Sequence, residues 1–285
     1  MGTVTRFDPD VEHLKTRAAL ADVLPRLVSL LRAVPDRDAA SGVPVWTVGD
    51  VGAHLASAFL AYGSLARGDD STDWDGILPP GDGRLDERVT AMNATAIGLF
   101  GDDERARLGD LVAEHGAAFL RDTAQLAPDT LVVVPWFRQR LTLAALTGLL
   151  LGESLVHGLD IARGAGLPWT IRPVEATLVL GQAMPTLMSL ACDTEKAAGT
   201  TLALDLVVKY GGPRLAVVVE DGAMTVTRDA PHRSYDCRLT VAPVTFLLVA
   251  FRRTPVWKAV AFGHLRAGGR RPWLATRLPQ LIASP

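Results

Sequence analysis

The sequence has little cysteine, and its charge is not of one sign. Its 285 residues include only Cys192 and Cys237, which stand 45 positions apart and form no CxxC pair. This scarcity argues against a disulfide scaffold and against a cysteine zinc site, and it favours a reducing cytoplasm. Lysine and arginine number 29 against 31 aspartate and glutamate, a formal net charge of −2. We therefore expect no nucleic acid and no membrane among the partners, since both require a clustered basic excess.

Long hydrophobic runs and lysines are also scarce. The longest apolar run, residues 141–151, is interrupted by Thr142, Thr147 and Gly148 and is too short to span a bilayer. The first 15 residues lack the apolar stretch of a signal peptide. Only four of the 29 basic residues are lysines, which indicates a GC-rich genome. The length predicts two domains or one large one.

The first half of the chain has the periodicity of helices. The second apolar segment begins with Thr47-x-x-Asp50, which is close to a capping box, and Trp46 precedes it as a staple. An aspartate-rich stretch, residues 67–83, predicts a surface loop that rims a site. Four amphipathic helices, the third extended or followed by residues 104–125, predict a four-helix bundle. The helical segments are residues 11–34, 47–62, 85–100 with 104–125, and 135–163.

The second half changes to the pattern of strands. Residues 201–210 alternate apolar and other side chains, which is typical of a strand, and Asp221-Gly222 indicates a hairpin. A helix precedes these strands, and three apolar segments compatible with helices follow them. We predict an α+β fold, with a helical bundle in residues 1–168 and a smaller domain on an antiparallel sheet in residues 169–285. The expected strands are residues 201–210, 214–220, 223–228 and 237–241.

The last helix of the first half carries ionisable residues on its apolar seam. Three leucines are followed, at steps of three and four, by Glu153, His157 and Asp160. Burying an unpaired carboxylate is costly, so such groups are usually paired, neutralised or bound to metal. Glu153 and His157 lie four apart, within reach of one ion. The same spacing also occurs in ordinary helix-surface pairs.

His54 is the candidate partner on another helix. It lies at the edge of the apolar stripe of residues 47–62, where a histidine is often only a satisfied core residue. If both helices direct these side chains inward, they form a His/Glu/His set with one position left open, as in catalytic zinc sites. HExxH and paired ExxH motifs are absent from the sequence. One divalent ion, Zn²⁺ or another, therefore fits the pattern better than a two-metal centre.

Two stretches resemble a known family. WTVGDVGAHLASAF at residues 46–59 and GESLVHGLDIARGAG at residues 152–166 are similar to the signature helices of the mycothiol-dependent maleylpyruvate isomerase family. The C-terminal stretch GHLRAGGRRPWLATRLPQLI is similar to the sterol-carrier-like α+β domain that often follows. The resemblance covers nearly the whole chain. It implies a DinB-like four-helix bundle in residues 1–168 and a sterol-carrier-like domain in residues 169–285.

The resemblance also implies site residues and a cofactor. It makes His54, Glu153 and His157 ligands of Zn²⁺, and it makes mycothiol the thiol that the enzyme activates in the cytoplasm. Asp160 matches the acidic residue that closes the motif, and we expect it to orient a ligand. Because neither cysteine lies in the bundle, the nucleophile is expected to be a small-molecule thiol.

The sequence allows several alternative functions. Transfer of the thiol to a small electrophile is the main hypothesis, and a maleylpyruvate-type cis–trans isomerisation is the first alternative. A non-catalytic small-molecule carrier is a second alternative, and hydrolysis by zinc-bound water ranks below thiol transfer. Arg84 and Arg140 are the expected contacts of thiol or substrate, because arginine pairs with carboxylates in a bidentate way. Further candidates for such a clamp are Arg138, Arg266, Arg270 and Arg271.

Overall fold

The computed structural model describes residues 7–69, 71, 73–79, 81, 83–228 and 234–283. The described part of the chain forms two compact units, one of residues 17–171 and one of residues 172–283 together with residues 7–16. The first unit is helical and the second is built on a sheet that is mainly antiparallel, which confirms the α+β fold class. The expected domain boundary between residues 168 and 169 stays a prediction.

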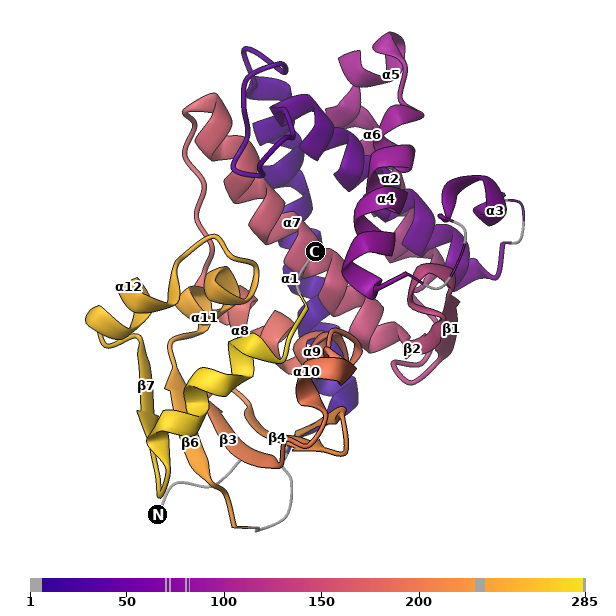
Figure 1. The fold of residues 1–285 in the computed structure, drawn as a ribbon. Helices are drawn as coiled ribbons and strands as arrows, with labels where there is room; N and C mark the ends of the chain where they lie inside the picture. Colours follow the sequence, from indigo (N-terminus) through magenta and orange to yellow (C-terminus); the bar gives the residue numbers. More distant parts are fainter. Residues whose placement is uncertain are drawn as a thin grey trace. The chain divides into compact units, whose positions relative to one another are not determined.

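Long helices dominate the first unit (Figure 1). The central helix α2 packs against α4, α6 and α7, and its buried Phe59 joins leucines of α7 in the core. The elements are α1 (Pro9–Ala33), whose residues before Arg17 belong to the second unit, α2 (Val48–Arg67), α3 (Trp74–Ile77), α4 (Leu85–Gly98), α5 (Asp102–Ala106), α6 (Leu108–Asp122), β1 (Leu131–Val134), a 3-10 turn (Pro135–Phe137), β2 (Gln139–Thr142) and α7 (Leu143–Ala165).

The start of α7 differs from the sequence prediction. We expected a helix from about residue 135, but the chain forms the hairpin β1–β2 there, with Val132 opposite Leu141. Arg138 adopts a left-handed conformation (φ 54°) and closes this hairpin after the 3-10 turn. The valine-rich β1 favours a strand because β-branched side chains suit a pleated surface. The helix itself begins after Thr142, whose hydroxyl oxygen accepts a hydrogen bond from the Ala145 N–H.

Two further segments differ in detail. The aspartate-rich stretch contains the short helix α3, while residues 70, 72, 80 and 82 lie outside the described part of the chain. Residues 104–125 are not one helix, because the chain breaks at Arg107 between α5 and α6. Pro25 lies inside α1, which nevertheless continues from Pro9 to Ala33.

The second unit contains a five-stranded sheet in the order β5-β4-β3-β6-β7. β3 and β6 pair in parallel and the other neighbours are antiparallel, so the sheet is mainly antiparallel, as expected, with one parallel pair. The single helix expected before the strands divides into α8 and α9. The elements are α8 (Pro173–Gln182), α9 (Met184–Leu190), α10 (Thr194–Ala197), β3 (Leu202–Val208), β4 (Arg214–Glu220), β5 (Ala223–Arg228), β6 (Cys237–Val241), α11 (Pro243–Ala250), α12 (Val256–Ala261), β7 (Leu265–Gly268) and a 3-10 helix, Pro272–Gln280.

A buried carboxylate ties three strands of this sheet together. Asp205 of β3 is 1% exposed, and its oxygens accept hydrogen bonds from Arg214 Nε of β4 and Arg238 Nε of β6, both at 2.6 Å. Burial alone would raise the pKa of Asp205, but these two guanidinium groups outweigh it and lower the pKa. The carboxylate therefore stays charged and links neighbouring strands.

One described helix, α7, is long and apolar enough by length and composition to cross a membrane. Its most apolar window is 83% buried within the fold. The core helix of a globular protein passes the same test, so the apolar character of α7 is explained by packing.

Candidate metal site

The beginning of α2 fixes the direction in which His54 leaves the helix. The Thr47 hydroxyl oxygen accepts a hydrogen bond from the Asp50 N–H, and Asp50 Oδ2 accepts one from the Thr47 N–H, both at 3.0 Å. This is the capping box that the sequence predicted. Asp50 also binds Arg105 Nη1 at 3.0 Å, which joins the start of α2 to α5.

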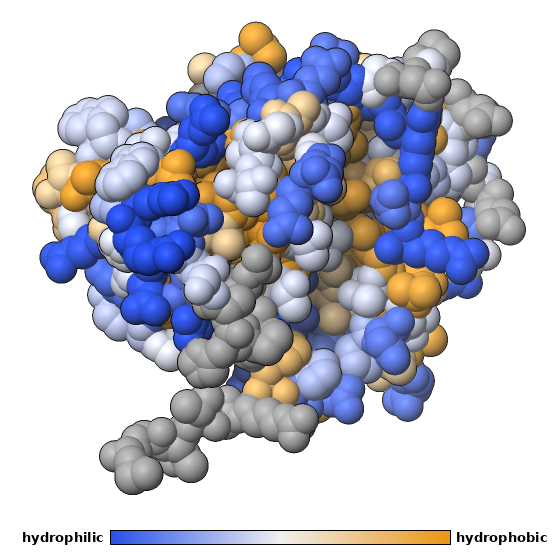
Figure 2. Space-filling view, turned by 60° about the horizontal axis from the view of Figure 1, so that its bottom comes forward, coloured by the Kyte–Doolittle hydropathy of each residue, from blue (hydrophilic) through white to orange (hydrophobic). Residues whose placement is uncertain are grey.

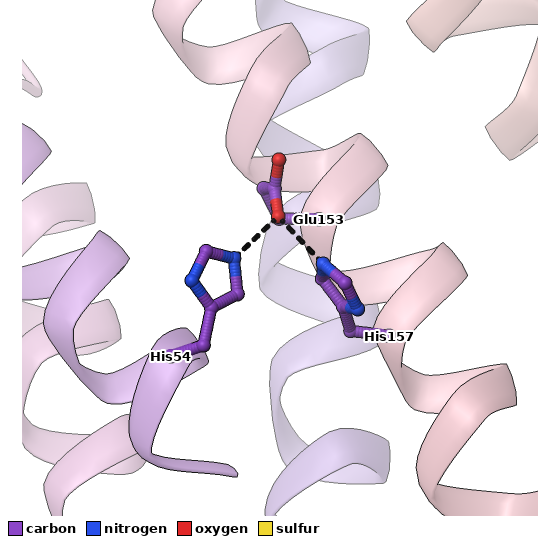
Figure 3. Close-up of side chains that lie close together, drawn as sticks. All are labelled: His54, Glu153 and His157. Carbon is purple, nitrogen blue, oxygen red and sulfur yellow. Dashed lines mark hydrogen bonds and ion pairs between the residues drawn. The ribbon is translucent and has the colours of Figure 1, made fainter. Parts of the chain in front are cut away.

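His54 of α2 meets Glu153 and His157 of α7 (Figure 3). Glu153 Oε2 lies 3.0 Å from His54 Nε2 and 3.1 Å from His157 Nε2. The two imidazole rings face each other edge to face, with centroids 4.8 Å apart. Among the described residues this is the one group of three or more His, Cys, Asp or Glu side chains whose ligand atoms all lie within 4.8 Å of one another.

Burial and charge act in opposite directions on these side chains. Burial would raise the pKa of Glu153, but hydrogen bonds from His157 and His54 outweigh it and hold the pKa well below its usual range. Burial would lower the pKa of His157, but hydrogen bonds to Asp160 and Glu153 raise it to about 9. In the absence of an ion the cluster is therefore a buried pair of opposite charges, and metal binding must displace a proton from His157.

Asp160 acts on the far side of His157. Its Oδ2 lies 3.0 Å from His157 Nδ1, and the residue has no exposed surface. A carboxylate in this position accepts a hydrogen bond from the Nδ1–H group and leaves Nε2 directed at Glu153. The loop before α2 closes over this carboxylate, because the Gly42 N–H donates to the Asp160 carbonyl oxygen at 3.1 Å. A Cβ at Gly42 would lie only 2.6 Å from Asp160 Oδ1.

Trp46 lies against both histidines, and the sequence predicted only a staple at this position. Its ring centroid is 5.2 Å from that of His54 and 6.2 Å from that of His157. From sequence alone, an aromatic residue directly before a helix N-cap cannot be distinguished as a hydrophobic staple or as a residue that lines a site. The indole restricts access of water to the cluster from this side.

A second aromatic group involves α2 and the hairpin. The Tyr62 ring lies 5.3 Å from that of Trp136, which in turn lies 5.4 Å from that of Trp74. Burial, and then the charge of Glu153, raise the pKa of Tyr62, against a hydrogen bond from Trp136. The phenol is therefore a protonated, buried group near the carboxylate. None of these three residues was predicted to belong to a site.

The arginines expected to contact thiol or substrate have other surroundings. Arg84 is the N-cap of α4, and its Nε lies 3.1 Å from Asp86 Oδ1. Arg140 is exposed on β2, opposite Val133. The structure thus brings His54, Glu153, His157 and Asp160 together, whereas contact of Arg84 or Arg140 with a thiol stays a prediction.

The other candidate arginines have contacts of their own. An Nη atom of Arg138 donates to the Gly81 carbonyl oxygen at 2.8 Å. In the second unit, Arg270 and Arg271 lie 3.9 and 3.6 Å from Asp236 Oδ1.

The three donors fit a divalent ion. Zinc bonds of about 2.0–2.2 Å in a tetrahedron place neighbouring donor atoms about 3.3–3.6 Å apart. The three donor atoms lie within 4.8 Å of one another, so side-chain shifts on the order of 1 Å would bring them into this geometry. Two imidazole nitrogens and one carboxylate oxygen are the donor set of catalytic zinc with an open position. The ligand side chains are partly accessible, with Glu153 20% exposed.

The fold and the site together define a class of two-unit proteins. One unit is helical and brings together two histidines and a glutamate that could hold a metal ion, and the other unit is built on a sheet. The chain belongs to the mycothiol maleylpyruvate isomerase family, because the profile of that family's N-terminal domain matches residues 17–162, about half of the chain. The family expected from the two signature stretches is thereby confirmed.

One solved structure is similar in fold, and two others align only at TM-scores below 0.5. A crystal structure of a mutant of the mycothiol-dependent maleylpyruvate isomerase aligns over 94% of this chain and 96% of its own, at 14% identity and a TM-score of 0.51. The inverting sec-alkylsulfatase Pisa1 from Pseudomonas sp. aligns over 50% of this chain at 17% identity and a TM-score of 0.31. A double mutant of that sulfatase aligns over 99% of this chain at 13% identity and 0.35.

This chain spans only 25% and 33% of the two sulfatase chains. A comparison with curated proteins gave no match.

Proposed function

We propose that this chain is a metal-dependent enzyme that uses a small-molecule thiol, mycothiol, as its cofactor, and that it isomerises a small cis-alkene conjugated to a carbonyl group. The observation that carries the proposal is the convergence of His54, Glu153 and His157 from two helices of the unit that the family profile matches. The family supports isomerisation over thiol transfer, so we place isomerisation first.

In such a reaction the thiolate sulfur adds to one alkene carbon, and the electron pair of the double bond moves toward the carbonyl oxygen. The former carbon–carbon double bond is then a single bond, and rotation about it brings the substituents into the trans arrangement. Expulsion of the thiolate restores the double bond, without net gain or loss of atoms. Bound Zn²⁺ would supply the positive charge that favours thiolate over thiol.

The protein's own residues prepare this site. His54, Glu153 and His157 would hold the ion, and Asp160 keeps the His157 proton on Nδ1. Trp46 shields the two imidazoles from water, which strengthens electrostatic interactions within the site. Cys192 and Cys237 are both free thiols, in keeping with a reducing cytoplasm as the place of activity.

Transfer of the thiol to an electrophile is the second candidate. The indole of Trp46 beside His54 favours this reaction, because it offers an apolar contact to an electrophile. A dicarboxylate substrate of an isomerase would instead require cationic side chains. The two reactions differ in whether thiol is consumed. An assay that follows free thiol and alkene geometry together distinguishes them, because the isomerase regenerates its thiol and the transferase does not.

Metal analysis and thiol binding test the proposal in order. We expect about one divalent ion per wild-type chain, none in His157→Ala, and an unchanged content in His115→Ala, a histidine of α6 outside the cluster. Wild-type protein without metal would overturn the enzyme proposal. Metal without a thermal shift on addition of mycothiol would retain the site and reject the thiol.

A further inference from the structure

The net charge of the whole chain conceals a strongly cationic segment. Residues 237–285 contain no aspartate or glutamate, although the chain has 31 of them. The same segment contains eight basic residues, so the rest of the chain is acidic. The basic residues are Arg238, Arg252, Arg253, Lys258, Arg266, Arg270, Arg271 and Arg277.

Helix α12 lies in this segment and exposes its apolar side chains. Val256, Trp257 and Val260 are 41, 66 and 52% exposed, and Phe262, directly after the helix, is 73% exposed. Ala259 alone among the α12 residues is buried. The outward face of the helix is therefore apolar, the reverse of an ordinary surface helix.

Cations and further aromatics surround this face. Lys258 Nζ lies 5.7 Å from the Trp257 ring, and exposed Arg252 directly precedes the segment that leads into α12. α12 packs against β7, an edge strand that carries exposed Arg266. The 3-10 helix beside β7 adds Trp273, which is 63% exposed. On the side where Figure 1 draws α12 and β7, Figure 2 shows hydrophobic and strongly hydrophilic residues directly side by side.

Part of this charge is balanced locally. Arg238 pairs with Asp205, and Arg270 and Arg271 lie within 4 Å of Asp236. Lys258 of α12 and Arg266 of the neighbouring strand β7 are both exposed. Positive charge therefore remains where the aromatic side chains are exposed.

We propose that α12 and β7, with the side chains around them, form a docking surface for an anionic phospholipid membrane. Tryptophan, phenylalanine and valine enter the boundary between headgroups and acyl chains, while lysine and arginine contact lipid phosphates. A nucleic acid fits less well, because valines offer no stacking surface for bases. A symmetric pair of copies through this face would bring cations against cations. The proposal does not depend on the thiol chemistry of the helical unit.

Vesicle co-sedimentation of the full chain tests this surface. We expect binding to vesicles in which about a third of the phosphatidylcholine is replaced by phosphatidylglycerol, and little binding to phosphatidylcholine alone. Raised salt should weaken the binding because the attraction is partly electrostatic. Trp257→Ser with Phe262→Ser, and separately Lys258→Glu, should each lower the partition coefficient about tenfold or more.

Two matched variants make the test specific. Leu99→Ser removes an equally exposed apolar side chain outside the patch, and Lys15→Glu changes the net charge by the same amount on α1. Both should bind vesicles like the wild type. Unchanged far-ultraviolet circular dichroism and metal content show that each variant is folded.

Several results would overturn the proposal. These are absence of binding to anionic vesicles, equal binding to neutral ones, and an equal loss in the patch variants and the matched variants. A dimer that becomes a monomer in Trp257→Ser would assign the face to a second copy. Displacement from vesicles by a short oligonucleotide or by polyglutamate at equal charge concentration would assign it to a soluble polyanion.

Discussion

His157 Nδ1 lies 3.0 Å from Oδ2 of Asp160, a carboxylate three residues further along α7 with no exposed surface. A carboxylate in this place makes the imidazole a stronger donor through Nε2, which faces Glu153. The arrangement explains why a buried charge stands on the apolar seam of a core helix.

Asp160→Asn should weaken metal binding without abolishing it. The amide oxygen can still accept a hydrogen bond from the Nδ1–H group, but the loss of negative charge lowers the basicity of His157, and we expect about 10–100-fold lower affinity. Competition with a chromophoric chelator measures this change.

Ser154→Ala is the matched control for that variant. Ser154 is also a buried polar residue of α7, but its hydroxyl donates to the Leu150 carbonyl oxygen rather than to a ligand side chain. Equal affinity in Asp160→Asn and wild type would contradict the positioning role of Asp160.

Gly42→Ala should disturb the same carboxylate from the loop side. The new Cβ would lie 2.6 Å from Asp160 Oδ1 and 2.9 Å from its Cα, and the Cα cannot move without α7. We expect a loss of about 1–3 kcal/mol in the free energy of unfolding and weaker metal binding. Urea denaturation and the chelator assay measure the two effects. Gly101→Ala, where nothing lies within 4 Å, should show neither.

Gly158→Ala tests how tightly the segment after α7 packs on the site helix. A Cβ there would lie 2.4 Å from Cε2 and Cζ2 of Trp169, whose Nε1–H donates to the Leu155 carbonyl oxygen at 2.9 Å. The ring must move, so we expect about 1–3 kcal/mol lower stability in urea denaturation.

Gly63→Ala on α2 is the opposite case. Its nearest neighbour is the flexible end of Arg67 at 3.5 Å, so alanine should stabilise the helix by about 0.5–1 kcal/mol. If both alanine variants changed stability equally, steric contact with Trp169 would not be the cause.

The convergence of His54, Glu153 and His157 could be predicted from sequence because its signal is local. Glu153 and His157 interrupt a run of leucines at helical spacing, and the Thr47 and Asp50 capping box places His54 on a defined helix face. A buried seam cannot tolerate such residues without partners, so their presence there indicates a site. That physical constraint acts within single helices, where sequence spacing is informative.

The parts that sequence did not predict depend on contacts between distant segments. The sequence indicates only a staple at Trp46, because its contact with His157 of α7 depends on the tertiary structure. The close contact of Gly42 with Asp160 depends on the tertiary structure in the same way. The prediction that a helix begins near residue 135 was wrong. The two strands of the hairpin have only four residues each, and so short an apolar pattern cannot be distinguished from the start of a helix. The parallel pairing of β3 with β6 likewise depends on tertiary structure.

Asp205→Asn should destabilise the sheet of the second unit in a pH-dependent way. The substitution leaves the Arg214 and Arg238 contacts without their shared negative charge. Since both arginines are about half exposed, we expect a loss of about 2 kcal/mol near neutral pH rather than the full cost of breaking a buried pair. The exposed pair of Arg84 and Asp86 is the matched case, and Asp86→Asn should cost less than about 1 kcal/mol.

The pH dependence follows from the lowered pKa of Asp205. A carboxylate with a lowered pKa in the folded state stabilises the protein above its unfolded pKa of about 3.9, and this stability is lost as the pH falls through the folded pKa. Urea denaturation of wild type and Asp205→Asn from about pH 7 to about pH 3 should therefore show a difference that narrows in acid. A constant difference across that range, or none at neutral pH, would show that the charge of Asp205 does not hold β3, β4 and β6 together.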